Sequence, residues 1–267
     1  MSEQATATSI ERYEGMPLQD WPTVVTAERQ ANYHAAAEMP KGLFGDVVDL
    51  SILANDTILA TSYLKTEAVD GLHAGQRMIQ KEPVYLDEPL TLKGRLAVVR
   101  QTGKGKILTY GFDFQRPDGS VPITGELISF QVDPAVMQQK GAGKAVETDR
   151  SGFEKICHKD LNPDLVGGYS FEFPGYLVHF DPKEAASVGL RAPVAQGLMS
   201  LTWMMEAVAL DGVPTAINIA TDFRSPIFWD DSVDVFAKIK EGGDTDLLVM
   251  KADGSVCSLG RVSDLVR

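Results

Sequence analysis

Two segments decide the fold of this 267-residue chain: EPVYLDEPLTLKGRL at 82–96 and SPIFWDDSVDVFAKI at 225–239. Both follow the pattern x-P-[VI]-[YF]-[LW]-D-[DE], after which apolar and polar residues alternate as in a strand with one buried face. Further along, RPDGSVPI from Arg116 matches KADGSVCS from Lys251, each with an Asp-Gly turn between alternating segments. Two matches in the same order predict a duplicated chain. The spacing falls from 143 residues at the first match to 135 at the second, so we expect a hairpin eight residues longer in the first half, around QTGKGKILTY at 101–110.

Each half also carries one helical candidate ahead of its strands. Asp49 is a good N-cap for LSILANDTILATSYL at 50–64, and LMSLTWMMEAVAL at 198–210 is apolar on nearly every side, as in a helix enclosed by protein. Each half is then a buried helix followed by an antiparallel meander, which is an α+β arrangement. We expect a first unit at 1–135, a linker at 136–150 and a second unit at 151–267, with the first unit serving as a wall for an apolar chain.

Composition narrows the class of protein. The chain is 44% apolar and 23% charged, with a net charge of −12 and a pI near 4.8, so it disfavours non-specific contact with nucleic acid or an anionic membrane. Two cysteines, Cys157 and Cys257, are too few for a disulfide framework, and their spacing is not that of a zinc site. The polar N-terminus has no secretory pattern, and no apolar stretch approaches the length of a membrane span. We expect a cytoplasmic protein with no metal and no cofactor.

The segment GYLVHFDPKEAASVGLRAPVAQGLMSL at 175–201 carries the chemistry. It resembles the hydratase motif of the MaoC-like family, the (R)-specific enoyl-CoA hydratases. His179, Asp181, Ala185, Gly189, Pro193 and Gly197 fall at matching places, including the 18-residue step from the catalytic His to the oxyanion-hole Gly. The resemblance covers about 30 residues closely and, with the repeat, implies two tandem hotdog domains, in each of which an antiparallel sheet wraps a central helix.

The resemblance implies a role for several residues, but one catalytic residue of the family has no counterpart in this sequence. His179 would transfer a proton, because imidazole titrates near neutrality, and the N–H of Gly197 at a helix start would donate to the thioester oxygen. Gln196 stands where the family has His before that glycine, and Tyr176 stands where it has Asn. The family's catalytic Asp lies five residues before the His, and here that position is Pro174.

A carboxylate from the first half is the expected replacement. In hotdog dehydratases of fatty-acid and polyketide synthesis, which this chain resembles in predicted fold, the second catalytic group comes from the neighbouring hotdog's helix. The matching candidate is Asp56, which at about 100° per residue falls on an apolar stripe with Ile52 and Leu59, where burial would raise its pKa. Asp49 is the second candidate, although it is better placed as a helix cap. Tyr176 could donate through its phenol or simply pack.

Three functions stay open. The first is reversible hydration of an α,β-unsaturated acyl-CoA by His179, Asp56 and Tyr176, with Gly197 and Gln196 binding the thioester oxygen. The second is a hotdog thioesterase in which a carboxylate directs water to the carbonyl, and the third is a non-catalytic acyl-binding or structural relative. Acyl-CoA is favoured over acyl carrier protein, since the carrier protein and this chain are both acidic. A homodimer is possible.

The remaining histidines and the lysines weigh less. His34 lies in a helical stretch whose charged face suggests solvent, His73 lies in the turn-like loop DGLHAGQ, and His158 lies in a strand candidate. Asp181, before Pro182, is a good helix cap. The stretch QTGKGK, with Gly103, Lys104, Gly105 and Lys106, is expected to be a hairpin tip, although its lysines would suit a phosphate of CoA.

Overall fold

The computed structural model describes residues 12–64, 71–133 and 149–267 and is built on one sheet of ten antiparallel strands. The strands lie side by side in the order β1-β3-β4-β5-β2-β7-β10-β9-β8-β6. Those of the first half are β1 (Trp21–Thr23), β2 (Leu72–Gln80), β3 (Leu90–Thr102), β4 (Gly105–Gln115) and β5 (Ile123–Val132). Those of the second half are β6 (Glu154–Asp160), β7 (Ala216–Phe223), β8 (Ser232–Ile239), β9 (Thr245–Lys251) and β10 (Val256–Val266). All but the last two residues of the expected linker, 136–150, lie outside the described residues.

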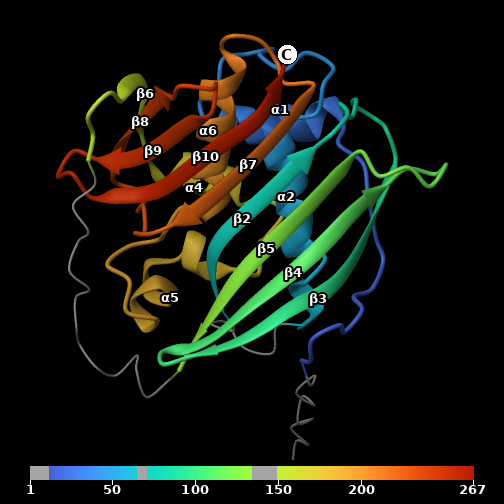
Figure 1. Ribbon diagram of the computed structural model, residues 1–267. Coiled ribbons are helices and arrows are strands. Elements are labelled where there is room, and N and C mark those ends of the chain that lie inside the picture. The colour runs from blue at the N-terminus through green and yellow to red at the C-terminus, as the bar shows by residue number, and fades with distance from the viewer. Residues whose placement is uncertain (1–11, 65–70, 134–148) are drawn as a thin grey trace, which may run out of the picture.

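Two central helices, α2 (Leu50–Leu59) and α6 (Gly197–Ala209), contact each other on one face of this sheet. Figure 1 shows both helices behind the strands, with β2 and β7 side by side at the middle of the sheet. The shorter elements are α1 (Ala27–Ala36), the 3-10 helix η1 (Ser62–Leu64), α4 (Pro163–Tyr169), the 3-10 helix η2 (Leu177–His179) and α5 (Pro182–Ser187). Each half thus has a central helix covered by a curved antiparallel sheet, which is the α+β arrangement predicted from the repeat.

The matched segments occupy corresponding places. Tyr85, in the stretch between β2 and β3, forms an isolated β-bridge with Val47, just ahead of α2. Phe228, between β7 and β8, forms the same bridge with Val194, just ahead of α6. The duplication predicted from the sequence is therefore confirmed in three dimensions.

The Asp-Gly turns correspond as well, and they explain the change in spacing. The backbone N–H of Arg116 donates to the carbonyl of Ser120 at 2.9 Å, and that of Lys251 donates to the carbonyl of Ser255 at 3.0 Å. The hairpin before the first turn pairs strands of 13 and 11 residues, whereas its counterpart pairs strands of 8 and 7. The longer hairpin is the one predicted around 101–110, and QTGKGK is its tip.

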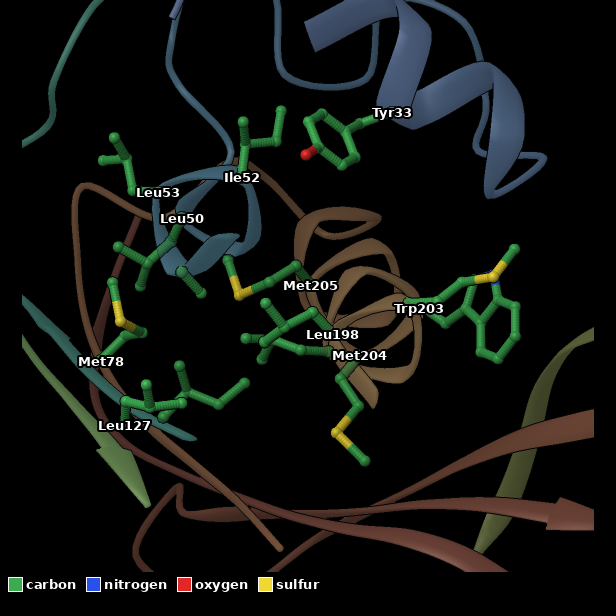
Figure 2. Packing of buried hydrophobic residues seen from close by; sticks show 14 of the residues in the cluster. Tyr33, Leu50, Ile52, Leu53, Met78, Leu127, Leu198, Trp203, Met204 and Met205 are labelled. Carbon is green, nitrogen blue, oxygen red and sulfur yellow. The ribbon is translucent and has the colours of Figure 1, made fainter. Parts of the chain in front are cut away.

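One apolar core spans both halves. Figure 2 shows Met205 of α6 directed toward α2, with Leu50 among the buried residues beyond it. Trp203, on another side of α6, is buried and donates its indole N–H to the carbonyl of Ala37 at 3.0 Å. Each large side chain buried in this way stabilises the fold by roughly 1.5–3 kcal/mol. The all-round apolar sequence of α6 follows from its position between the sheet, α2 and the N-terminal segment.

The first central helix is shorter than the sequence predicted. Asp49 caps it as expected, since its carboxylate accepts from the N–H of Ser51 at 2.9 Å. Regular α-helix ends at Leu59 rather than at residue 64, and the last turn is η1. The hydroxyls of Thr61 and Ser62 donate to carbonyls three or four residues back, and such bonds compete with helix geometry.

The expectation for His34 was wrong. Its side chain is buried, and its Nε2 lies 3.0 Å from a carboxylate oxygen of Asp49. Glu28 and Glu38 of this stretch are exposed, but Arg29 is shielded and α1 turns His34 toward the start of α2 instead of toward solvent. In the described part of the chain, no helix is both long and apolar enough to cross a membrane.

Gly260 tests the packing between α6 and the sheet. A Cβ at this position in β10 would lie 2.6 Å from Met204 Sδ and 2.9 Å from Leu247 Cβ. We expect Gly260→Ala to lower the free energy of unfolding by about 1–3 kcal/mol through overpacking. The neighbouring exposed residue gives the control, since Arg261→Ala is expected to change it by no more than about 0.5 kcal/mol. Urea denaturation measures both, and equal effects would contradict the packing described here.

Candidate active site

A cavity of about 620 Å³ lies between the two halves. From the first half it is lined by Arg12, Ile58, Thr61, Leu64, Gly71, Leu72, His73, Ala74, Tyr110, Leu127, Ser129 and Phe130. From the second half it is lined by Phe173, Tyr176, Val178, His179, Val188, Leu190, Val194, Ala195, Gln196, Gly197, Ser200, Phe223, Arg224, Ser225, Pro226, Ile227, Cys257 and Ser258. Most of the lining is apolar, with a few polar groups among it, which is typical of a site for a small organic ligand.

The structure brings His179 into this wall and fixes its ring. Its Nδ1 lies 2.6 Å from the carbonyl oxygen of Val194, and the N–H of Val194 in turn donates to the carbonyl of Val178 at 3.1 Å. A carbonyl oxygen can only accept, so Nδ1 carries the proton and the lone pair of the neutral ring is on Nε2. His179 is thus in the tautomer that accepts a proton at Nε2. A backbone carbonyl orients its ring, whereas the MaoC-like motif implies a carboxylate nearby.

The start of α6 lies in the same wall. Gln196 is its N-cap residue, but its side chain makes no capping hydrogen bond, whereas Asp49 caps α2 with its own carboxylate. The first N–H groups of a helix carry partial positive charge, so an uncapped start suits a carbonyl oxygen that gains negative charge. The side chain of Phe223 lies 3.0 Å from the place a Cβ would take on Gly197. A larger residue here would press on this ring, so the close approach favours glycine.

Gln196 adds a second donor. The residue is 8% exposed, and its side-chain Nε2 has no hydrogen-bond partner. A buried amide donor left without a partner costs about 1–3 kcal/mol. A ligand oxygen that the amide could reach by a side-chain rotation would recover this energy.

Tyr176 lies three residues before His179 and lines the cavity. It is half-buried, and its ring lies edge-to-face against that of Phe173, with 6.1 Å between centroids.

Asp181 is a helix cap, as the sequence predicted, because its carboxylate accepts from the N–H of Lys183 at 2.7 Å and caps α5. Pro174, at the family's Asp position, is exposed. The contiguous motif therefore forms one wall, without a carboxylate at its usual place.

The hypothesis that Asp56 faces His179 is wrong. Asp56 is 1% exposed and does not line the cavity. Its carboxylate accepts from Arg29 Nη2 at 2.8 Å and from Thr23 Oγ1 at 2.9 Å, on the side of α2 turned toward α1 and β1. Burial raises the pKa of Asp56, as expected, although Arg29 and Thr23 act in the opposite direction. The carboxylate of Asp49, the second candidate, likewise has other partners, because it binds the N–H of Ser51 and the ring of His34.

Asp56→Asn is therefore expected to affect folding, contrary to the behaviour of an exposed catalytic acid. We expect the free energy of unfolding to fall by roughly 3 kcal/mol, the lower end of the range for a broken buried ion pair, because Glu172 still neutralises Arg29. Asp20→Asn, in the exposed pair with Lys93, is the control and is expected to cost less than about 1 kcal/mol. Chemical denaturation of both variants measures the difference, and unchanged stability in Asp56→Asn would refute this assignment.

His73, which the sequence predicted to lie in a turn-like loop, lines the cavity. It belongs to β2, where a register shift between His73 and Gly75 marks a β-bulge, a device that re-aims side chains. Its Nε2 lies 3.1 Å from Gln76 Oε1, and its ring meets that of Phe223 edge-to-face at 4.7 Å. The two glycines of DGLHAGQ favour a turn, and the stretch has no alternation of apolar and polar residues that would predict a strand.

Among the described lining residues, none is Asp or Glu. In the same part of the chain, no group of three or more His, Cys, Asp or Glu side chains is arranged to hold a metal ion. Cys257 lines the cavity, but burial raises its pKa to about 12, so its thiol stays protonated near neutral pH. A cavity with imidazole, amide and phenol groups can move protons and bind a carbonyl, and its thiol is a poor nucleophile.

The raised pKa of Cys257 predicts slow alkylation. At pH 8 an ordinary thiol with a pKa near 8.5 is about one quarter thiolate, whereas a thiol with a pKa of about 12 is thiolate in about one molecule in 10⁴. We expect iodoacetamide to modify Cys257 at least about 10³-fold more slowly than free cysteine, and faster as the pH rises. The Cys157→Ser variant isolates this thiol, and mass spectrometry follows it. Modification at the rate of free cysteine would show that Cys257 is an activated thiol.

Comparison with known proteins supports the fold. No family model and no curated protein matches the sequence. A MaoC-like dehydratase from Phytophthora capsici has a TM-score of 0.74 at 16% identity, over 92% of this chain and 94% of that one. A conserved hypothetical protein from Mycobacterium tuberculosis, described as having a double hotdog fold, has a TM-score of 0.66 at 11% identity, over 95% and 97%. A putative oleoyl thioesterase from Lactobacillus plantarum has a TM-score of 0.57 at 11% identity, over 93% and 95%. The chain is a double-hotdog protein, as the sequence resemblance implied.

Proposed function

We propose that this protein catalyses the reversible hydration of an α,β-unsaturated acyl thioester, with acyl-CoA as substrate. The observation that carries the proposal is that His179 and the uncapped start of α6 line one cavity. The first supplies a proton acceptor and the second supplies donors for a thioester oxygen, the two requirements of the reaction that this chain's own residues can meet. The similarity to a MaoC-like dehydratase agrees with this choice.

The steps follow from the groups in the wall. Nε2 of His179 takes a proton from water as the water oxygen bonds to the β-carbon. The thioester oxygen gains negative charge and accepts from the N–H of Gly197 and the amide of Gln196. The α-carbon then takes a proton from the phenol of Tyr176 or from a protonated His73 ring, and the double bond of the thioester carbonyl re-forms. The proton on His179 then passes through solvent to the group that donated, which restores both residues. The product carries the hydroxyl of water on the β-carbon and a hydrogen on the α-carbon, and dehydration reverses each step.

The apolar part of the cavity is assigned to the acyl chain, with the first half as its wall. Ile58, Leu64 and Leu127 lie in this wall, together with the half-buried Phe130. CoA is preferred to acyl carrier protein because the net charge of −12 slows encounter with an acidic carrier. A cytoplasmic location and a homodimer remain predictions from the sequence.

A carboxylate-directed thioesterase has less support, since the described lining has no Asp or Glu. Acyl binding without turnover is the alternative that this same feature favours. A panel of enoyl-CoAs separates the three functions when loss of conjugation and release of free thiol are both followed. Loss of conjugation alone supports the hydratase, thiol release supports the thioesterase, and binding without either supports the acyl-binding protein.

His179→Gln is expected to lower the hydration rate by about 10²-fold or more, the scale of one general base, while the protein stays folded. The matched control is His158→Gln, an exposed histidine on β6 paired with Asp234, which should leave the rate unchanged. His73→Gln and Tyr176→Phe, compared by their kcat values, identify which of the two protonates the α-carbon. Full activity in His179→Gln would overturn the proposed mechanism.

A further inference from the structure

Arg29 of α1 joins elements that are far apart in the sequence. Its Nε donates to Glu172 Oε1 at 2.7 Å and its Nη2 donates to Glu172 Oε2 at 2.8 Å, which makes a bidentate pair across 143 residues. The same Nη2 donates to Asp56 Oδ1 at 2.8 Å on α2. One guanidinium of the first half therefore holds a carboxylate of its own half and one of the second half.

This group is shielded from water. The side chain of Arg29 is 12% exposed, that of Asp56 1% and that of Glu172 19%. Burial alone would lower the pKa of Arg29, but the two carboxylates outweigh it and raise the pKa, so the guanidinium stays charged. Tyr33 donates its hydroxyl to Glu172 Oε2 at 2.6 Å, and its ring contacts Phe171 at 5.0 Å between centroids. Polar and aromatic contacts thus hold Phe171 and Glu172 against the first half.

Glu172 lies within the first of three consecutive tight turns, the last of which ends at the cavity. The N–H of Phe173 donates to the carbonyl of Ser170 at 2.9 Å, that of Tyr176 to Phe173 at 2.9 Å, and that of His179 to Tyr176 at 3.1 Å. Each turn starts where the previous one ends, so a displacement of Glu172 passes to Phe173, then to Tyr176 and then to His179. Three of these residues line the cavity.

We infer that Arg29 is a positioning residue of the candidate active site: by binding Glu172 to the first half, it sets where Tyr176 and His179 stand in the cavity wall. Arg29 is not among the described lining residues and acts through Glu172. The inference rests on the proposed function only where it assigns chemistry to His179. The imidazole tautomer of His179 reports its position without turnover, and kcat reports it during turnover.

Two variants loosen the contact and keep its bulk. Arg29→Lys keeps the charge but replaces the fork with a single ammonium, which cannot bind a carboxylate in the bidentate way. Glu172→Gln keeps the shape and the acceptor for Tyr33 but removes the charge. The matched controls are Arg77→Lys and Glu126→Gln, in an exposed pair at 3.2 Å whose side chains are 51% and 45% exposed. Tyr33→Phe, which removes one hydroxyl, is the milder variant if the others fail to fold.

The first readout is the imidazole tautomer. The chain has four histidines, so ¹⁵N-histidine spectra can be assigned with a His179→Gln reference. The wild type is expected to show His179 as the Nδ1–H tautomer, bonded to Val194. In Arg29→Lys and Glu172→Gln we expect this signature to broaden or shift toward a tautomer mixture, while the controls keep it. A role confined to stability would leave it unchanged in folded protein.

The second readout is the hydration of the best enoyl-CoA of the panel, well below the melting temperature. Arg29→Lys and Glu172→Gln are expected to lower kcat by about 10- to 100-fold with a smaller change in KM. The reason is that displacing a catalytic group by about 1 Å lowers the rate by up to about this factor. Wild-type spectra and wild-type kcat in both folded variants would overturn the inference. If the wild type hydrates no enoyl-CoA, the proposed function fails, and the tautomer spectra alone decide whether Arg29 positions His179.

Discussion

The antiparallel pairing of β2 with β7, from Gly75 opposite Asp222 to Gln80 opposite Ile217, is the contact on which the rest of the structure depends. These strands are the fifth and sixth of ten, so their ladder joins two five-stranded sheets into one. A continuous twisted sheet brings its central helices onto the same face. The meeting of α2 with α6, the common core and the cavity with walls from both halves all follow from this pairing. Either half alone would expose one side of its helix and half of the cavity.

Much of this fold could be predicted from the sequence because its signals are local and occur twice. The Pro-Val-Tyr and Pro-Ile-Phe segments, and the two Asp-Gly turns, each identify a turn by its own residues and do not depend on the rest of the chain. Their changed spacing even located the longer hairpin. The end of α2 depends on a weak local signal, namely hydroxyls that bond to carbonyls three or four residues back, whereas the burial of His34 depends on a contact with another part of the chain. Thr61 and Ser62 compete for backbone carbonyls, and His34 meets Asp49, which lies on another helix.

In the candidate site too, residues of one local motif could be predicted from the sequence, whereas residues placed by tertiary contacts could not. His179, Gln196 and Gly197 belong to one contiguous motif, and the structure places them on one wall as the motif implied. The resemblance to hotdog dehydratases implies Asp56 by its place on the first central helix, and its angle on that helix predicts burial. Neither says which neighbour its face meets, because that is set by the tertiary fold. Asp56 is bound by Arg29 of α1 and does not line the cavity that holds His179. His73 needed a β-bulge, and Arg29 needed a partner 143 residues away, neither of which has a sequence pattern.

The different starts of α2 and α6 bear on how a duplicated protein divides its labour. A capping side chain is worth about 1 kcal/mol, and α2 has one in Asp49 while α6 has none in Gln196. In a protein with a single copy of this unit, one helix start would have to serve both stability and ligand binding, and gains in one would be losses in the other. Duplication separates the two demands. The first copy can keep the sealed, stabilising helix end, and the second is free to change the residues at its open end without loss of the fold.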